Sequence, residues 1–258
     1  MELAPYAGYA AVYDRTGQSR FGLRMLSYAY RLWGERWPES VLDLACGTGA
    51  TTVALALRGV QVAGLDRSQE MLQVAELRAK RWGVSPDWIS GDYRKISLVR
   101  QFTNAICFYD ALNYCQSINE LEGVFRQVAN CIKPGGQFLF DTVTTYGIRY
   151  LWGKQSDVRV DDDIVRVWRT SYDPRSELGT IRITYFLLPE NESKLPCPVT
   201  PCWQRFDEVH QHRGFDPVEV HAALQTAGWE PRATYRCLSW ETPDATSYRV
   251  AYLAERRS

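Results

Sequence analysis

Short apolar runs alternate with helical patterns across the first 140 residues of the chain. Five runs of strand length predict buried strands, at residues 41–46, 60–65, 88–90, 104–109 and 137–140. Around them, helical spacing predicts helices over 19–35, 50–58, 68–82 and 118–132. This alternation favours a doubly wound α/β fold, in which helices cover both faces of a parallel sheet.

A different pattern begins after Thr142. Apolar and polar residues alternate with period two over 158–160, 164–169, 180–186 and 205–210. Such alternation is typical of antiparallel strands with one buried face. We therefore expect an inserted antiparallel β cap over 146–212 and a main domain made of 1–145 and 213–258. A helix over 215–227 and two final strands, 229–240 and 247–254, complete a Rossmann-like, mostly parallel seven-stranded sheet.

Composition narrows the class of protein. The 30 basic and 30 acidic side chains cancel, so no net charge draws the chain to nucleic acid. No apolar run reaches the roughly 18 residues of a membrane-spanning helix, and no signal peptide is recognisable at the start. Seven cysteines, an odd number, fit reduced thiols and a cytoplasmic location. Cys197 and Cys202 lie close together without further zinc ligands, so we expect no metal.

The first predicted strand leads into a glycine-rich loop. Asp43 lies in the strand, Gly47 and Gly49 form the loop, and a helix pattern follows. Glycines permit a tight turn and close approach to a ligand, and a helix start presents unpaired N–H groups. Asp66 ends the second strand, 19 residues beyond Gly47, where a carboxylate can accept hydrogen bonds from ribose hydroxyls.

These motifs resemble those of the class I S-adenosylmethionine-dependent methyltransferases, as do Gly91-Asp92-Tyr93 and the turn before the fifth strand, residues 133–136. The resemblance implies that Asp43 faces the donor's α-amino group, that Asp66 holds its ribose, and that Asp92 lies near its adenine amine. It also implies that the donor site includes Ala45, Gly47, Gly49, Arg67, Met71, Tyr93, Tyr109 and, from a lid, Tyr9.

Two other functions share parts of this pattern. A nicotinamide-dependent oxidoreductase has the same first strand, glycine loop and ribose acid. The loop here lacks a third glycine, however, and has Thr51-Thr52 where the helix packs. The Gly91-Asp92 pair and the final antiparallel strands also favour methyl transfer. A non-catalytic donor-binding module that serves a partner would carry the same motifs, and turnover of the donor would distinguish it from an enzyme.

The segment after the fourth strand occupies the position where acceptors bind in this family. Asp110, Asn113 and Tyr114 resemble the Asp-x-x-Asn-Tyr stretch of small-molecule methyltransferases. The segment differs from the Asn/Asp-Pro-Pro-aromatic motif of enzymes that methylate bases or glutamine amides. The resemblance thus implies methyl transfer to a nitrogen or oxygen of a small molecule bound by these three residues. Asp110, Asn113 and Asp141 also resemble the magnesium ligands of catechol-type enzymes, which is the less favoured alternative.

In-line displacement at a sulfonium depends mainly on positioning, with a general base where the acceptor must lose a proton. The N-terminal tyrosines resemble a segment of amino-sugar N-methyltransferases that folds over the donor, and Tyr13 is a catalytic candidate.

Glu208 and His210 share one face of a predicted strand. We expect His210 to be the base and Glu208 to orient it, in a cap that binds the acceptor. The alternative is polar pairing between strands. The acceptor's identity and the oligomeric state stay open.

Overall fold

Seven strands form the main sheet, in the order β11-β12-β6-β5-β2-β3-β4. The computed structural model describes residues 2–3, 5–188 and 203–258. Five mutually parallel strands are β2 (Ser40–Leu44), β3 (Gln61–Asp66), β4 (Asp87–Ser90), β5 (Phe102–Cys107) and β6 (Ile132–Val143). At the other edge, β12 (Arg249–Arg256) is antiparallel to β6, and β11 (Trp229–Arg236) is antiparallel to β12. This order confirms the predicted Rossmann-like sheet.

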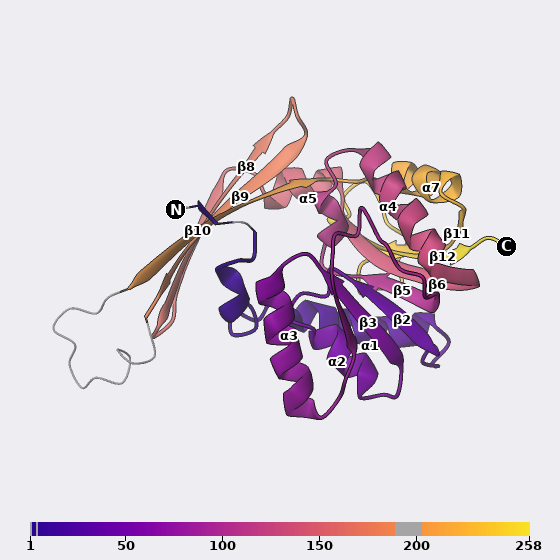
Figure 1. Cartoon of the computed structure of the whole chain (residues 1–258). Coiled ribbons are helices and arrows are strands. Elements are labelled where there is room, and N and C mark those ends of the chain that lie inside the picture. Colours follow the sequence, from indigo (N-terminus) through magenta and orange to yellow (C-terminus); the bar gives the residue numbers. More distant parts are fainter. Residues whose placement is uncertain (1, 4, 189–202) are drawn as a thin grey trace.

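Helices cover both faces of this sheet (Figure 1). They are α1 (Ser19–Leu32), α2 (Ala50–Ala56), α3 (Gln69–Trp82), α4 (Ile118–Cys131) and α7 (Pro217–Thr226). Side chains alternate along β6, so Phe138 and Phe140 pack with Phe125 of α4 on one face. Leu139 belongs to the core on the other face, together with Met25 of α1. The near-continuous apolar strands of the sequence are therefore buried on both sides, as in other parallel sheets.

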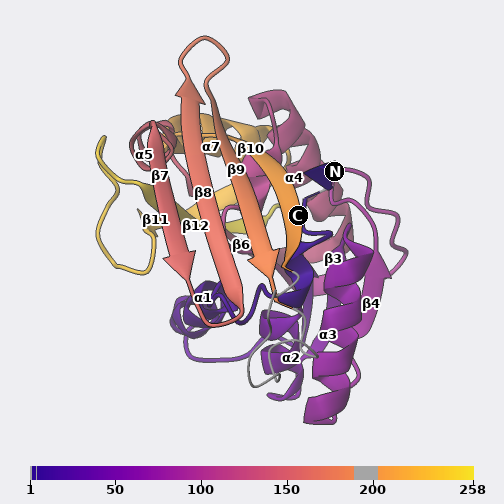
Figure 2. The same ribbon diagram turned by 90° about the vertical axis from the view of Figure 1, so that its left-hand side faces the viewer.

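A second sheet projects from the first and has the order β1-β10-β9-β8-β7 (Figure 2). Its antiparallel strands are β7 (Gln155–Val160), β8 (Ile164–Asp173), β9 (Leu178–Leu187) and β10 (Gln204–Arg213). The short β1 (Glu2–Leu3) pairs in parallel with β10, so the N-terminal segment crosses to this sheet. That crossing was not predicted. We call the sheet of β7 to β10 the cap sheet.

Two connecting features differ from the sequence-based prediction. Residues Thr145–Leu151 form a helix, α5, where we expected the antiparallel segment to begin. The hydroxyl of Thr144 accepts a hydrogen bond from the backbone nitrogen of Gly147 at 2.9 Å, which caps this helix. Residues 133–136, expected to form a turn, belong to β6, where the pairing with β5 shifts register between Phe102 and Asn104. A turn is thus replaced by an irregular strand start.

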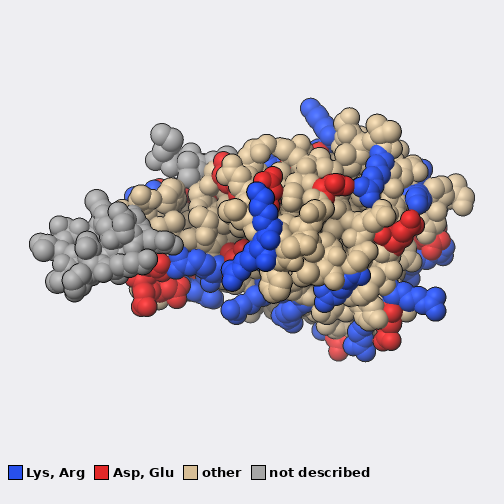
Figure 3. Space-filling model, turned by 60° about the horizontal axis from the view of Figure 1, so that its bottom comes forward, with Lys and Arg blue, Asp and Glu red and all other residues tan. Residues whose placement is uncertain are grey.

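The surface of the described residues carries charges of both signs, which lie intermixed on the face shown in Figure 3. Within the part of the chain that the structure describes, no helix is long and apolar enough to cross a membrane. Cys197 and Cys202, whose spacing was considered for metal binding, lie outside the described residues.

Candidate active site

The glycine loop after β2 turns through three left-handed residues. Ala45, Gly47 and Gly49 have φ values of 52°, 55° and 69°. Gly49 is the N-cap of α2, and a Cβ there would lie 2.6 Å from the Trp88 ring and 2.7 Å from the Cβ of Ala75. Both the conformation and the packing therefore require glycine at position 49. This turn brings the backbone of Gly47 to the carboxyl end of β3.

Asp66 lies at that end of β3. Its carboxylate accepts hydrogen bonds from the backbone nitrogens of Gly47 at 2.8 Å and Ser68 at 2.9 Å, and the residue is 8% exposed. Burial raises the Asp66 pKa, and the two backbone hydrogen bonds oppose this rise. The same contacts fix the carboxylate beside a cavity, where it can accept further hydrogen bonds from a ligand.

This donor cavity encloses about 630 Å³ of empty space, part of which is open to solvent. It lies beyond the carboxyl ends of β2, β3 and β4. Its lining includes most of the residues expected to bind the donor: Ala45, Gly47, Asp66, Arg67, Met71, Asp92, Tyr93 and Tyr109. Tyr6 and Tyr13, which belong to the N-terminal segment, close the cavity from the side of the cap sheet.

A smaller cavity of about 420 Å³ continues from the glycine loop and contains Asp43. The hydroxyl of Thr52 donates a hydrogen bond of 2.6 Å to the Asp43 carboxylate. Burial raises the Asp43 pKa to about 7, although the Thr52 hydrogen bond acts in the opposite direction. A buried carboxylate with this pKa is suited to a cationic ligand group, because a positive charge would restore its ionised form.

A third cavity, of about 650 Å³, lies between the main sheet and the cap sheet. We call it the cap-side cavity. Tyr9, Trp152, Trp168, Ile181 and Ile183 form an apolar wall, and His210 and His212 project into it from β10. Four tyrosines line both this cavity and the donor cavity: Tyr6, Tyr13, Tyr109 and Tyr114. The two cavities therefore share a wall made of these four phenol side chains.

The range that contains the glycine loop, Asp66 and Asp92 matches a known family. Residues 41–136 match the family model of a methyltransferase domain. Over 97% of both chains, the protein is 29% identical to the putative methyltransferase YqeM of Bacillus subtilis. The protein is an S-adenosylmethionine-dependent methyltransferase. Its donor is S-adenosylmethionine, and the nicotinamide-dependent and non-catalytic alternatives are not supported.

The fold of this methyltransferase matches those of solved methyltransferase structures over nearly the whole chain. An S-adenosylmethionine-dependent methyltransferase from Clostridium acetobutylicum has a TM-score of 0.82 at 24% identity, covering 98% of this chain and 99% of that one. The sugar N-methyltransferase KedS8 of Streptoalloteichus has a TM-score of 0.75 at 23% identity, with 95% and 93% covered. At these identities the comparison establishes the fold. Because at least 95% of this chain is covered, the match extends into the cap sheet.

Two residues expected at the donor lie elsewhere in the methyltransferase. Gly49 lines none of the three cavities, since it shapes the turn and packs against Trp88. Tyr9 lines the cap-side cavity alone, where its ring stacks on Tyr185 of β9 with centroids 4.4 Å apart. Tyr9 is thus part of the cap-side wall, and Tyr6 takes the place expected for it at the donor.

Asn113 has a structural role where we expected a substrate contact. Its side-chain nitrogen donates to the backbone oxygens of Val143 at 2.8 Å and Arg213 at 2.6 Å, and its oxygen accepts from the Val143 nitrogen at 2.9 Å. The side chain is fully buried and lines none of the three cavities. The amide holds the ends of β6 and β10 together and has little capacity left for an acceptor.

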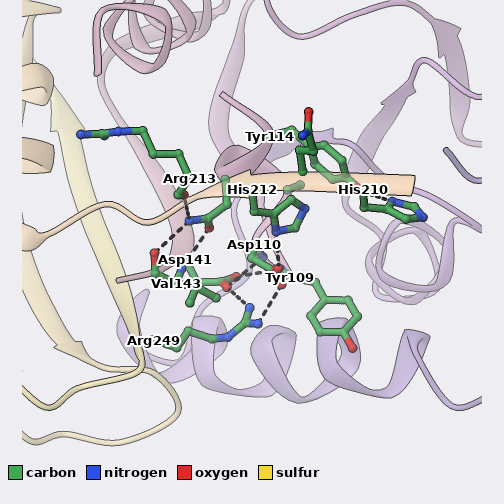
Figure 4. A network of polar contacts seen from close by, with 12 residues as sticks. Tyr109, Asp110, Tyr114, Asp141, Val143, His210, His212, Arg213 and Arg249 are labelled. Atoms are coloured by element: carbon green, nitrogen blue, oxygen red, sulfur yellow. Dashed lines mark hydrogen bonds and ion pairs between the residues drawn. The ribbon is translucent and has the colours of Figure 1, made fainter. Parts of the chain in front are cut away.

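Asp110 is buried in an ionic network that the sequence did not reveal (Figure 4). Arg249 of β12 contacts Asp110 at 2.7 Å and Asp141 at 2.5 Å. Burial alone would raise the Asp110 pKa, but Arg249 and His212 hold it below its usual value. Arg249 already pairs with both of the carboxylates that the magnesium alternative would need. Only its position in a predicted terminal strand could have drawn attention to it.

His210 faces the cap-side cavity, and its ring contacts two neighbours. Its Nε2 lies 3.2 Å from the carboxylate of Glu208, and its Nδ1 lies 2.5 Å from the hydroxyl of Tyr114. Glu208 therefore does contact the ring, as expected. Glu208 also accepts hydrogen bonds of 2.9 Å from the backbone nitrogens of Tyr6, Gly8 and Tyr9. Its main role is to hold the N-terminal segment against the cap sheet.

Proposed function

We propose that this methyltransferase transfers a methyl group to a nitrogen or oxygen of a small molecule bound in the cap-side cavity. The observation that carries this proposal is the shared wall of the two cavities. Tyr13 and Tyr109 line the donor cavity, the cap-side cavity and the smaller cavity around Asp43. An acceptor in the cap-side cavity would therefore lie across this wall from the donor, in reach of an in-line displacement.

The lining of the cap-side cavity favours an acceptor with a ring. Aromatic side chains make up half of the lining and offer flat surfaces to a sugar or aromatic ring. Asp110 is already paired with Arg249, so it is not a free carboxylate for a cationic acceptor. The structurally similar KedS8 is a sugar N-methyltransferase, which agrees with an acceptor that contains a ring. The expected cap, residues 146–212, supplies most of the apolar wall, which supports a role for the cap in binding the acceptor.

An acceptor screen tests this function. Purified protein would be incubated with S-adenosylmethionine and a fractionated metabolite extract, and acceptors would be found as masses that gain one methyl group in place of a hydrogen. We expect the product in the small-molecule fractions, and we expect Trp168→Ala to weaken acceptor binding while donor affinity is kept. Methylation confined to protein or nucleic-acid fractions would contradict the proposal. Asp66→Ala serves as the control with an impaired donor site.

A further inference from the structure

Strand β10 carries two buried histidines on one face, and their rings differ in what they contact (Figure 4). Both ring nitrogens of His210 have a partner within the protein, as described above. His210 is therefore a link between Glu208 and Tyr114. A general base needs a free lone pair that faces the acceptor, and His210 has none unless these contacts are broken.

His212 has a free ring nitrogen. Its Nδ1 lies 3.2 Å from the Asp110 carboxylate, at ion-pair distance but without hydrogen-bond alignment. Its Nε2 is buried and has no hydrogen-bond partner among the residues that the structure describes. The residue is 5% exposed and lines the cap-side cavity. Trp152 stacks on the ring with centroids 4.5 Å apart and Tyr114 meets it edge-on at 4.2 Å, so the ring plane is fixed from two sides.

We propose that His212 is the general base of this methyltransferase and that Asp110 is its positioning residue. This inference rests on the proposed function, since it assumes an acceptor in the cap-side cavity. In the step, the acceptor's electron pair forms a bond to the methyl carbon while the carbon–sulfur bond breaks, and the sulfonium becomes a thioether. The proton of the acceptor nitrogen or oxygen passes to Nε2 of His212. The resulting imidazolium faces the carboxylate of Asp110.

The electrostatics around the ring fit this role. Burial lowers the pKa of His212, and the neighbouring Asp110 opposes that change. The ring is therefore neutral at neutral pH, with a lone pair available on Nε2 when the proton resides on Nδ1. The other charged and titratable groups that face it are His210 on the same strand, Tyr114 of η2 (Ala111–Tyr114) and Arg249 of β12. Arg249 keeps Asp110 ionised, so the carboxylate stays able to stabilise the imidazolium.

The tautomer of His212 is testable without turnover. The chain contains three histidines, so protein labelled with ¹⁵N-histidine gives few signals. We expect a neutral His212 ring with its proton on Nδ1 and a bare Nε2, and His212→Asn assigns the signal. A His212 ring protonated on Nε2, or cationic at neutral pH, would overturn the proposal. The acceptor-free protein suffices for this measurement.

Kinetics on the identified acceptor supply the second test. We expect His212→Asn to lower kcat roughly a hundredfold, the low end for general base catalysis, and to abolish the acid limb of the pH–rate profile. His210→Asn should lower activity through Tyr114 but keep that limb. His221→Asn, on α7 and bonded to Thr234, should match the wild type. Donor affinity by calorimetry and thermal melting establish that each variant is folded.

The outcomes distinguish the role of His212 from the proposed function. A His212→Asn enzyme with wild-type kcat, or one that keeps the acid limb while His210→Asn loses it, would refute the base assignment and leave the proposed function intact. A wild-type protein that methylates no small molecule would refute the proposed function itself.

Discussion

The buried carboxylate of Glu208 accepts a hydrogen bond of 2.9 Å from the backbone nitrogen of Tyr9, which ties the N-terminal segment to strand β10. The nitrogens of Tyr6 and Gly8 donate to the same carboxylate. Tyr6 and Tyr13 of this segment line the donor cavity. One side chain of the cap sheet thus holds in place a wall of the donor site.

Glu208→Ala should release the N-terminal segment. Three backbone N–H groups would lose their acceptor, and leaving one such group buried and unpaired costs about 1–3 kcal/mol. We expect faster proteolysis within residues 5–18 and a several-fold loss of donor affinity, measured by mass spectrometry and calorimetry. Glu241→Ala, at an exposed acid, should leave both unchanged. Unaltered protection in Glu208→Ala would show that the segment is held by other contacts.

Asp66→Ala should weaken S-adenosylmethionine binding by at least tenfold. Hydrogen bonds to a charged group contribute about 1.5–3 kcal/mol each, and the Asp66 carboxylate also fixes the Gly47 backbone. Calorimetry on the folded variant measures the change. Asp87→Ala, at an exposed acid on β4, is the control. If both variants bind the donor equally well, Asp66 has no part in the site.

Donor binding should release a proton near pH 6.5. In the free protein the Asp43 pKa is about 7, so at this pH much of the group is protonated. The positive charge of the donor's amino group would favour the carboxylate and expel that proton. Because the folded pKa lies above that of the unfolded chain, Asp43 makes the free energy of unfolding fall as pH rises from about 4 to about 7.

Calorimetry in buffers of different ionisation enthalpy measures this proton. The release should vanish at pH 8.5, where Asp43 is already ionised, and in Asp43→Asn at every pH. A release that persists in Asp43→Asn would assign the proton to another group, of which Asp66 is the first to test.

Arg249→Met should destabilise the fold by about 3–5 kcal/mol, because it leaves Asp110 and Asp141 as buried carboxylates without their cation. Chemical denaturation measures the free energy of unfolding. Arg232→Met removes an exposed pair with Glu255 and should cost less than about 1 kcal/mol. Equal effects of the two substitutions would mean that water screens the network around Arg249.

The sequence predicts features that depend on local rules. Ser68 caps α3, with its hydroxyl 3.2 Å from the Met71 nitrogen, because an N-cap needs only the next three residues. Asp66 and Gly47 meet because parallel strands end at one edge of a sheet. The period-two segments after residue 155 became antiparallel strands for the same local reason.

The features that were not predicted depend on contacts between residues that are distant in sequence. Asn113 is fixed by the backbones of Val143 and Arg213, so its motif gave no indication that the amide is occupied. Arg249 reaches Asp110 only because β12 inserts beside β6. His212 and His210 share a strand face, and only the packing of Tyr114 and Asp110 distinguishes them.

The polypeptide leaves the main sheet for the cap sheet and returns to it at one place. The backbone oxygen of Val143 accepts a hydrogen bond of 3.1 Å from the nitrogen of Phe215, and the Thr145 nitrogen donates to Asp216 at 3.1 Å. An inserted segment whose two ends already touch can be exchanged between homologues as a unit. The main domain, which holds the donor site, then needs no new connecting loop. Recombination at this junction would let acceptor preference diverge within a lineage while the chemistry of the donor stays constant.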